Sequence, residues 1–195
     1  MKFYQEITII PNHEIGEYFI WSKLFTQIHL GFVSIQDEQE KSPIGISFPE
    51  YFMDKKFGIL GSKLRLFAQS ESDLLRFDTK KHLSRLSDYV HISNIREVPQ
   101  KINSYSTYSR YQPKVNKERL ARRRAIRHKV DYDSALEHYS SMNHKTITMP
   151  YINLKSLSSK NEFCLWIKKT STTEPSNKKI YSTYGLSSSS TVPEF

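Results

Sequence analysis

Histidines are the side chains of this chain best suited to proton transfer, because an unperturbed imidazole titrates at about pH 6.5. There are seven: His13, His29, His82, His91, His128, His138 and His144. Phe25, Ile28 and Phe32 mark the apolar face of one predicted helix, and His29 lies near the C-terminal end of that helix. A lone histidine on a helix is more often structural than catalytic, so His29 is a candidate that needs further support.

One histidine is sufficient for one class of reaction, the cleavage of RNA without a metal. A base takes the proton of a ribose 2′-hydroxyl, and that oxygen then attacks the adjacent phosphate. The sequence has one cysteine, Cys164, no HExxH run and no glycine-rich phosphate loop, and His138 and His144 lack the spacing of a zinc site. We therefore expect neither a metal nor a cofactor.

The net charge of the chain lies in one segment. Residues 101–130 carry ten of the 29 Lys and Arg residues and only one acid, Glu118, which leaves 19 charges of each sign elsewhere. Basic runs are most often solvated surface helices, but this density without interleaved acids is typical of a polyanion-binding element. We therefore predict a nucleic acid as the partner.

The sequence gives no signal for a membrane or for export. No apolar run approaches the roughly 20 residues that a membrane helix needs. Met1 opens directly into KFYQEITII, without a basic region and a cleavage site. The single Cys164 excludes an internal disulfide framework, which suits a reducing compartment. We expect a cytoplasmic protein with no membrane partner.

The first 100 residues predict the element order β-α-β-β-α-β. This order is typical of the ferredoxin-like fold, which recurs in RNA-binding proteins but hosts many unrelated functions. We therefore predict an α+β protein whose first domain spans residues 1–100. The predicted elements are a strand at 2–10, a helix capped by Asn12 and ending near 34, β-like runs at 44–48 and at 58–68 with a turn at Gly61 and Ser62, a helical stretch opening with a capping box at 70–73, and a strand at 91–98.

An arginine-rich helix is the main feature predicted for residues 101–195. Residues 101–113 read as an extended connector, and Asn116 can cap a helix that runs to about residue 130. Its arginines fall within about 140° of each other on a helical wheel, while Ala121 and Ala125 lie opposite. Phosphates along that face would stabilise the helix better than its small apolar surface. The arginines are Arg119, Arg122, Arg123 and Arg127.

A small antiparallel sheet is predicted for the remaining residues. Strands at 147–154, 162–169 and 178–186 follow a short helix at 133–142, and residues 187–190 read as a surface loop. The turn between the first two strands is rich in serine, and its hydroxyls could contact phosphate or ribose, although such a turn is by default only a turn. The hydroxyls are those of Ser156, Ser158 and Ser159.

Six short runs occur along the chain in the order and spacing of one known family. They are QIH at 27–29, IGISFPE at 44–50, SRYQ at 109–112, RLARR at 119–123, the Ser156/Ser158 turn with Phe163 beyond it, and YGLS at 184–187 ahead of Val192 and Pro193. With these runs the chain resembles the Csy-type endoribonucleases that process CRISPR repeats in type I-F systems. The resemblance favours a catalytic over a structural role for His29.

The resemblance implies a ferredoxin-like domain at 1–100 that carries the catalytic histidine, and a region at 101–195 that grips the hairpin of the CRISPR repeat. The reaction would be metal-independent cleavage at the base of that hairpin, leaving a 2′,3′-cyclic phosphate and a 5′-hydroxyl. The product would stay bound, and the nuclease would join the backbone, large and small subunits of the type I-F Cascade complex. Transposition proteins would be further partners if that complex serves transposon targeting.

The resemblance also implies roles for individual residues. His29 would be the general base, Ser156 would fix the attacking ribose, and Tyr184 would orient the imidazole. Arg110 and Gln112 would read base edges in the lower stem, where each side chain can offer two hydrogen bonds. The other implied RNA contacts are Ser158 at a phosphate, Phe163 stacked on the bottom base pair, and Arg119, Arg122, Arg123 and Arg127 along the stem.

Two departures from the family pattern concern the RNA contacts. Ile126 stands where the family's helix often has another arginine, and residues 187–190 are serines where the family loop is usually rich in glycine. Two alternatives stay open: a noncatalytic RNA-hairpin-binding subunit on the same fold, and a basic DNA-binding regulator. The second lacks any clear helix-turn-helix signal.

Overall fold

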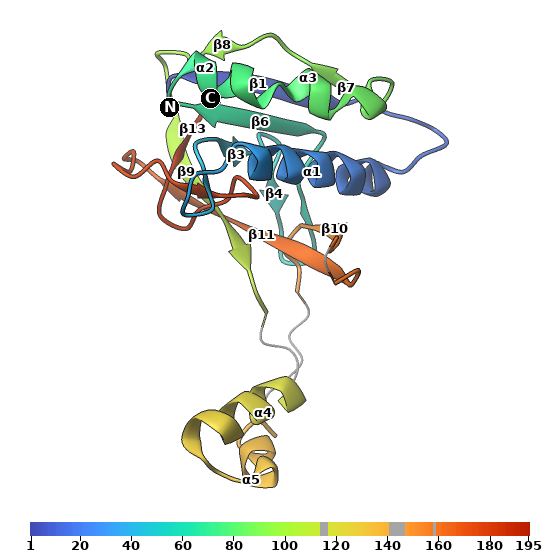
Figure 1. The fold of residues 1–195 in the computed structure, drawn as a ribbon, viewed down its shortest axis with the longest axis vertical. Coiled ribbons are helices and arrows are strands. Elements are labelled where there is room, and N and C mark those ends of the chain that lie inside the picture. The colour runs from blue at the N-terminus through green and yellow to red at the C-terminus, as the bar shows by residue number, and fades with distance from the viewer. Residues whose placement is uncertain (114–116, 141–146, 158) are drawn as a thin grey trace. The chain divides into compact units, whose positions relative to one another are not determined.

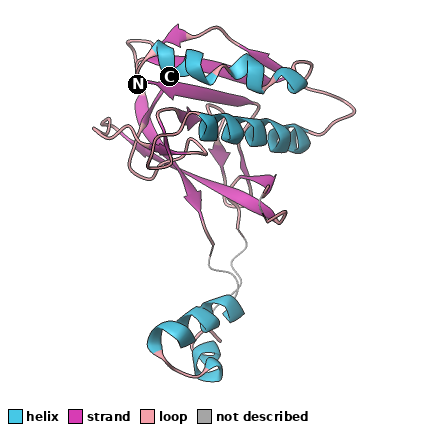
Figure 2. Ribbon diagram, in the orientation of Figure 1, coloured by secondary structure: helices cyan, strands magenta, loops and turns pink. Residues whose placement is uncertain are grey.

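The protein divides into two compact units that do not follow a single cut in the sequence. The structure, a computed structural model, describes residues 1–113, 117–140, 147–157 and 159–195 (Figure 1). One unit comprises Met1–Tyr111 and Met149–Phe195, and the other comprises Gln112–Thr148. Helices and strands both contribute, so the fold is α+β, as predicted (Figure 2). Strands from both sides of residue 100 share the first unit.

The first sheet of this unit has the strand order β3-β6-β1-β7, with β8 also paired to β1. All of its pairings are antiparallel. Buried and partly exposed residues alternate along β1, with Ile7 and Ile9 inside, which gives the sheet one face toward the core. The strands are β1 (Phe3–Ile9), β3 (Gly45–Ser47), β6 (Lys63–Ala68), β7 (Val90–Ile92) and β8 (Arg96–Glu97).

The predicted run at 58–68 forms two strands, one on each side of the predicted turn at Gly61 and Ser62. Gly61 has a φ of +76°, a left-handed conformation that breaks the strand. The residues before it form β5 (Gly58–Ile59), which pairs with β4 (Phe52–Met53) in a separate hairpin. Only the residues after it join the first sheet, as β6.

The first helix of this unit ends at Ser34, as predicted, but it begins at Glu17 after Gly16. The predicted cap Asn12 instead accepts from the N–H groups of Glu14 and Ile15. α1 (Glu17–Ser34) buries one side, including Leu24, Phe25 and Ile28, as the periodicity predicts. The Ser70 hydroxyl accepts from the Asp73 N–H at 3.3 Å and caps the next helix, as expected from the capping box. The other helical elements are α2 (Glu71–Phe77), α3 (Thr79–His82) and the 3₁₀ turn η1 (Ser84–Leu86).

The second sheet of the first unit has the antiparallel order β10-β11-β9-β13. Residues 101–113 were predicted to be a connector, and that prediction was wrong, because β9 is an inner strand of this sheet. Its buried positions are polar in type: Ser106 and Tyr108, whose hydroxyl donates to Glu194 Oε1 at 2.8 Å. The sequence of this strand therefore lacks the alternation of apolar and polar residues that predicts a half-buried strand. The strands are β9 (Ser104–Tyr111), β10 (Tyr151–Lys155), β11 (Glu162–Thr172) and β13 (Val192–Glu194).

The predicted third strand at 178–186 is only β12 (Tyr181–Ser182), which pairs with β2 (Lys41–Ser42) rather than with the second sheet. A tight turn follows β12. The serines at 187–190 are not a mere surface loop either, because Ser190 is buried and its hydroxyl donates to the Ile180 carbonyl at 2.8 Å. The loop prediction fails at Ser190 because its hydroxyl is satisfied inside the fold by the main chain of Ile180.

The second unit consists of α4 (Lys117–His128) and α5 (Tyr132–Glu137). Ala121 and Ala135 are fully buried, so the two helices meet through small side chains. Asp131 accepts from the N–H groups of Asp133 and Ser134 at the start of α5. The Ser134 side chain first, and then these two main-chain bonds, lower the pKa of the Asp131 carboxyl. The predicted cap Asn116 lies outside the described residues. No helix in the described ranges is both long and apolar enough to cross a membrane.

The turn after β12 depends on Gly185, whose φ is +70°. The Gly185 N–H donates to the Ser182 carbonyl at 2.8 Å, and the Ile46 N–H donates to the Gly185 carbonyl at 3.1 Å. A Cβ at this glycine would lie 2.5 Å from Ile46 Cγ2 and 2.9 Å from the Phe32 ring. Both the backbone conformation and the lack of space therefore require glycine here.

We expect Gly185→Ala to lower the free energy of unfolding by about 2 kcal/mol, because a β-carbon adds strain and a steric clash. Chemical denaturation measures this. Gly16→Ala is the matched control, since nothing lies within 4 Å of its added carbon, and it should cost less than about 1 kcal/mol. Equal effects of the two substitutions would contradict the assignment.

Candidate active site

His29 is held in one tautomer by the main chain. Its Nδ1 lies 2.8 Å from the carbonyl oxygen of Thr183. A carbonyl can only accept a hydrogen bond, so Nδ1 carries the proton in the neutral ring. The other nitrogen, Nε2, therefore keeps its lone pair and can take a proton from a ligand.

Tyr184 holds the plane of the same imidazole. The two rings stack with centroids 4.0 Å apart and an interplanar angle of 3°. Tyr184 is also nearly parallel to Phe25, one helical turn before His29 on α1, with centroids 6.4 Å apart. Burial raises the pKa of the Tyr184 hydroxyl, and the Arg110 charge opposes that shift. The hydroxyl consequently stays protonated near neutral pH.

A pocket of about 350 Å³ opens beside this stack. α1 forms one wall, the hairpin of β10 and β11 forms another, and the turn after β12 supplies Tyr184. Three predicted site residues besides Tyr184 share this pocket. Its lining is Thr26, His29, Leu30, Val33, Leu154, Lys155, Ser156, Leu157, Phe163 and Tyr184.

Ser156 follows β10 at the start of the hairpin turn. Its N–H donates to the Asn161 carbonyl at 2.9 Å, and its hydroxyl accepts from the Ser159 N–H at 3.2 Å. These bonds hold Ser156 at the edge of the pocket that it lines. The predicted phosphate contact Ser158 lies outside the described residues.

Arg110 reaches the same region from β9. Its guanidinium carbon lies 5.3 Å from the centroid of the Phe163 ring, within the range of a cation–π contact. The side chain is otherwise exposed. A fixed positive charge therefore stands beside an aromatic ring that lines the pocket.

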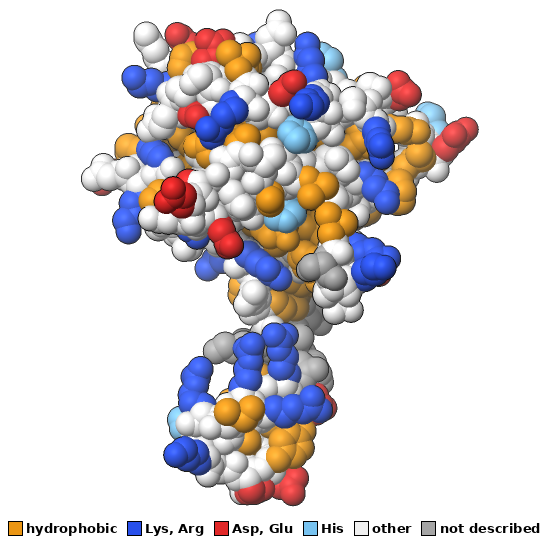
Figure 3. All heavy atoms as spheres, viewed as in Figure 1, with side chains coloured by type: hydrophobic (Ala, Val, Ile, Leu, Met, Phe, Trp, Pro, Cys, Tyr) orange, Lys and Arg blue, Asp and Glu red, His pale blue; other side chains and the backbone are white. Residues whose placement is uncertain are grey.

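The remaining predicted RNA contacts belong to the second unit, where Lys and Arg side chains gather over α4 in Figure 3. Four arginines of α4 are exposed, whereas Ala121 is buried on the opposite side. Ile126 is 82% exposed in the same helix. The predicted contacts in this unit are Gln112, Arg119, Arg122, Arg123 and Arg127.

The comparisons with known proteins agree on one family. The family model described as CRISPR-associated protein (Cas_Csy4) matches residues 4–195. The chain belongs to this family. Two relatives, from Escherichia coli (strain UTI89 / UPEC) and Pseudomonas aeruginosa (strain UCBPP-PA14), are both named CRISPR-associated endonuclease Cas6/Csy4. Each is 29% identical over 195 residues, covering 100% of both chains.

The predicted kinship with CRISPR repeat-processing nucleases is thus confirmed, and the relatives' names agree with the prediction of an enzyme. Among solved structures, a chain titled CRISPR associated protein Cas6 aligns over 100% of this chain with 10% identity and a TM-score of 0.34. That likeness is too loose to inform the site.

Sequence reasoning missed two residues of the candidate site in this Cas_Csy4 family member. Thr183 contributes its main-chain carbonyl, and such an acceptor has no signal in the residue type. Its position directly before Tyr184 and Gly185 was the available clue. Lys155 lines the pocket next to Ser156, and it brings a positive charge that the sequence analysis did not single out.

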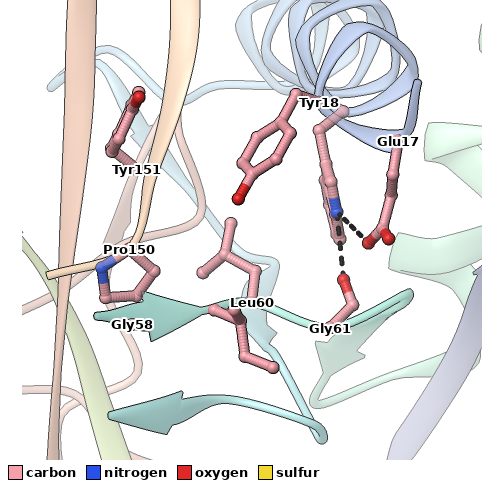
Figure 4. A pocket seen from close by; sticks show the side chains of 9 residues that line it. Glu17, Tyr18, Gly58, Leu60, Gly61, Pro150 and Tyr151 are labelled. Atoms are coloured by element: carbon pink, nitrogen blue, oxygen red, sulfur yellow. Dashed lines mark hydrogen bonds between the residues drawn. The ribbon is translucent and has the colours of Figure 1, made fainter. Parts of the chain in front are cut away.

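A second cavity, of about 140 Å³, lies elsewhere in the first unit (Figure 4). Its wall includes Trp21, whose indole N–H donates to the Gly61 carbonyl at 3.0 Å and to Glu17 at 3.2 Å. Glu17 is therefore occupied by a structural contact. Within the described residues, no group of three or more His, Cys, Asp or Glu side chains could hold a metal ion.

We expect ¹⁵N NMR of the neutral protein to show His29 protonated at Nδ1 and not at Nε2. The reason is the Thr183 carbonyl, which offers Nδ1 an acceptor and no donor. His91, exposed on β7, is the internal comparison in the same spectrum. A His29 signal dominated by the Nε2-protonated tautomer would contradict the geometry.

Proposed function

We propose that this protein is a metal-independent endoribonuclease that cleaves precursor crRNA at the base of the CRISPR repeat hairpin. The observation that carries the proposal is the Nδ1 hydrogen bond of His29, which leaves Nε2 as a base in a pocket shared with Ser156 and Phe163. Membership of the Cas_Csy4 family supports it, as do relatives named as CRISPR-associated endonucleases.

The reaction needs one proton transfer to begin. His29 Nε2 removes the proton of a ribose 2′-hydroxyl, and the freed oxygen attacks the adjacent phosphate and expels the 5′-oxygen. The products are a 2′,3′-cyclic phosphate and a 5′-hydroxyl. Tyr184 keeps the imidazole plane fixed by stacking, and the Ser156 hydroxyl holds the attacking ribose. Such positioning is effective because the nucleophile is already part of the substrate.

Recognition of the hairpin falls to residues around the pocket and in the second unit. Phe163 offers a ring on which the bottom base pair can stack, with Arg110 beside it to reach a base edge. Gln112 reads a second edge in the same stem. The exposed arginines of α4 bind phosphates along the stem, where shape and phosphate spacing are accessible near the end of a short A-form helix.

The first sheet and its helices have the element order of a ferredoxin-like fold. The order β-α-β-β-α-β, with spatial strand order β7-β1-β6-β3, supports a ferredoxin-like assignment for the first sheet and its helices. In this proposal residues 1–100 carry the catalytic His29, and residues 101–195 grip the hairpin. The mature crRNA stays bound to the protein, which then serves as a subunit of the type I-F Cascade complex.

His29→Ala should reduce the rate of cleavage of the repeat hairpin by about a hundred- to ten-thousand-fold while leaving affinity nearly unchanged, because the imidazole moves a proton and neutralises no phosphate. Single-turnover cleavage and filter binding measure the two quantities. His91→Ala is the matched control, and it should cut at the wild-type rate. A His29→Ala protein that still cuts normally would show that His29 is not the base.

The same assay in EDTA distinguishes the mechanism. Wild-type protein should cut the repeat once in chelator, and an RNA with 2′-deoxyribose at the cut position should bind but not react, since the nucleophile has been deleted. Cleavage of the deoxy substrate that requires magnesium would mean that a metal-activated water attacks, and the His29 assignment would be abandoned.

The arginines of α4 should dominate the electrostatic affinity. Replacing Arg122, Arg123 and Arg127 by Ala should lower the slope of log K against log salt by roughly two to three units, if each side chain contacts one phosphate. Cleavage of saturating RNA should persist. Titrations of hairpin binding over a range of salt concentrations measure the slope.

A matched control removes the same charge from another surface. Lys80, Lys81 and Arg85 are exposed around α3, and their triple alanine variant should change the slope much less. If both triple variants change it equally, the effect reports net charge and not a binding face.

A further inference from the structure

The outward face of the second sheet carries a row of aromatic residues. Leu165 and Ile167 of β11 are buried, so Trp166 between them points to the other side of the sheet. Trp166 pairs directly with Tyr151 of β10 and with Tyr111 of β9. Residues opposite each other in a sheet share a face, so the three aromatic residues form one row across three strands.

The row is accessible from solvent. Tyr111 is 38% exposed, and Trp166 and Tyr151 are half-buried, with their ring centroids 4.5 Å apart. Neighbouring outward positions are also open: Asn153 and Cys164 on one side, Lys168 on the other. α1 packs against β10, whose Ile152 and Leu154 face the core. Tyr151 also lines the cavity of about 140 Å³ that Tyr18 and Trp21 of α1 border.

The composition of this face suits nucleotides better than a protein. Its outward positions hold aromatic, hydroxyl, amide and ammonium groups and no Val, Ile, Leu, Met or Phe. Cations outnumber acids, with Lys155 and Lys168 against Glu162 at the edge. The outward residues are Tyr105, Thr107, Ser109 and Tyr111 on β9, Tyr151, Asn153 and Lys155 on β10, and Glu162, Cys164, Trp166, Lys168 and Thr170 on β11.

We propose that this face, the Tyr151–Trp166–Tyr111 row with Lys168, binds single-stranded RNA that flanks the hairpin. The inference rests on the proposed function, because it takes RNA as the ligand. Strands in a sheet are about 4.8 Å apart, so a row across three strands spans roughly 10 Å and can stack about two or three bases. Base stacking on aromatic side chains tolerates any sequence, as a variable flank requires.

Strand β9 connects this face to the candidate active site. Arg110 lies on the inner side beside Phe163, and Tyr111 comes next in the chain on the outer side. A single strand that leaves the bottom of the stem at Phe163 would meet the aromatic row within a few nucleotides. The row would then hold the flank without touching the hairpin itself.

The test compares three RNAs: the repeat hairpin alone, the hairpin with a single-stranded extension of about six nucleotides on its 5′ side, and the hairpin with the same extension on its 3′ side. Wild-type protein should bind one of the extended RNAs more tightly than the hairpin. Trp166→Ala should remove most of that advantage, on the order of tenfold, with hairpin affinity unchanged. Trp166→Phe keeps a stacking ring and should retain most of it.

Two further variants guard against a folding defect. Tyr111→Ala changes a more exposed ring and should show the same selective loss, whereas Phe19→Ala, 55% exposed on α1, should change neither affinity. Two results would overturn the inference and leave the face to a protein partner. One is that wild-type protein binds the hairpin and both extended RNAs equally well. The other is that the Trp166 and Tyr111 variants lose the same affinity for the hairpin as for the extended RNAs. A failure of cleavage in these assays with the flank effect intact would contradict only the proposed function.

Discussion

A single hydrogen bond, from His29 Nδ1 to the Thr183 carbonyl, gives the candidate site its chemistry. Because the acceptor is a main-chain oxygen, no side-chain substitution at residue 183 removes it, and its position depends on the backbone turn around Gly185. Contacts within the first unit hold that turn in place. β12 and β2 anchor one side of it, and Ile46 in the first sheet binds its carbonyl.

Three segments far apart in the sequence therefore meet at the imidazole: α1, the hairpin of β10 and β11, and the turn after β12. None of them forms a local active-site motif, which explains why each sequence run is weak by itself. The proposed base, ribose contact and stacking ring must keep their mutual distances to act together. A core of interlocked sheets supplies that rigidity better than a loop could.

Sequence reasoning named the side chains that the pocket brings together. It missed much of the structure that positions them. The α1 periodicity placed His29 correctly because apolar spacing on a helix has a strong signal, and the serine turn was found from its composition. β9 was not predicted as a strand because its buried residues, Tyr108 and Ser106, are polar in type. The burial of Ser190 was not predicted for the same reason. Thr183 was out of reach, since its contribution is a carbonyl that every residue possesses.

The second unit is inserted between two strands that both pair with β11 at one residue. Tyr111 ends β9, Tyr151 begins β10, and each lies opposite Trp166. The insertion thus leaves and re-enters the first unit only two strand spacings apart, at one end of a sheet. Changes in its length or sequence need not alter the register of any strand. Such an architecture lets the unit with the basic helix α4 diverge in evolution, or be exchanged by design, while the unit with the candidate site is inherited unchanged.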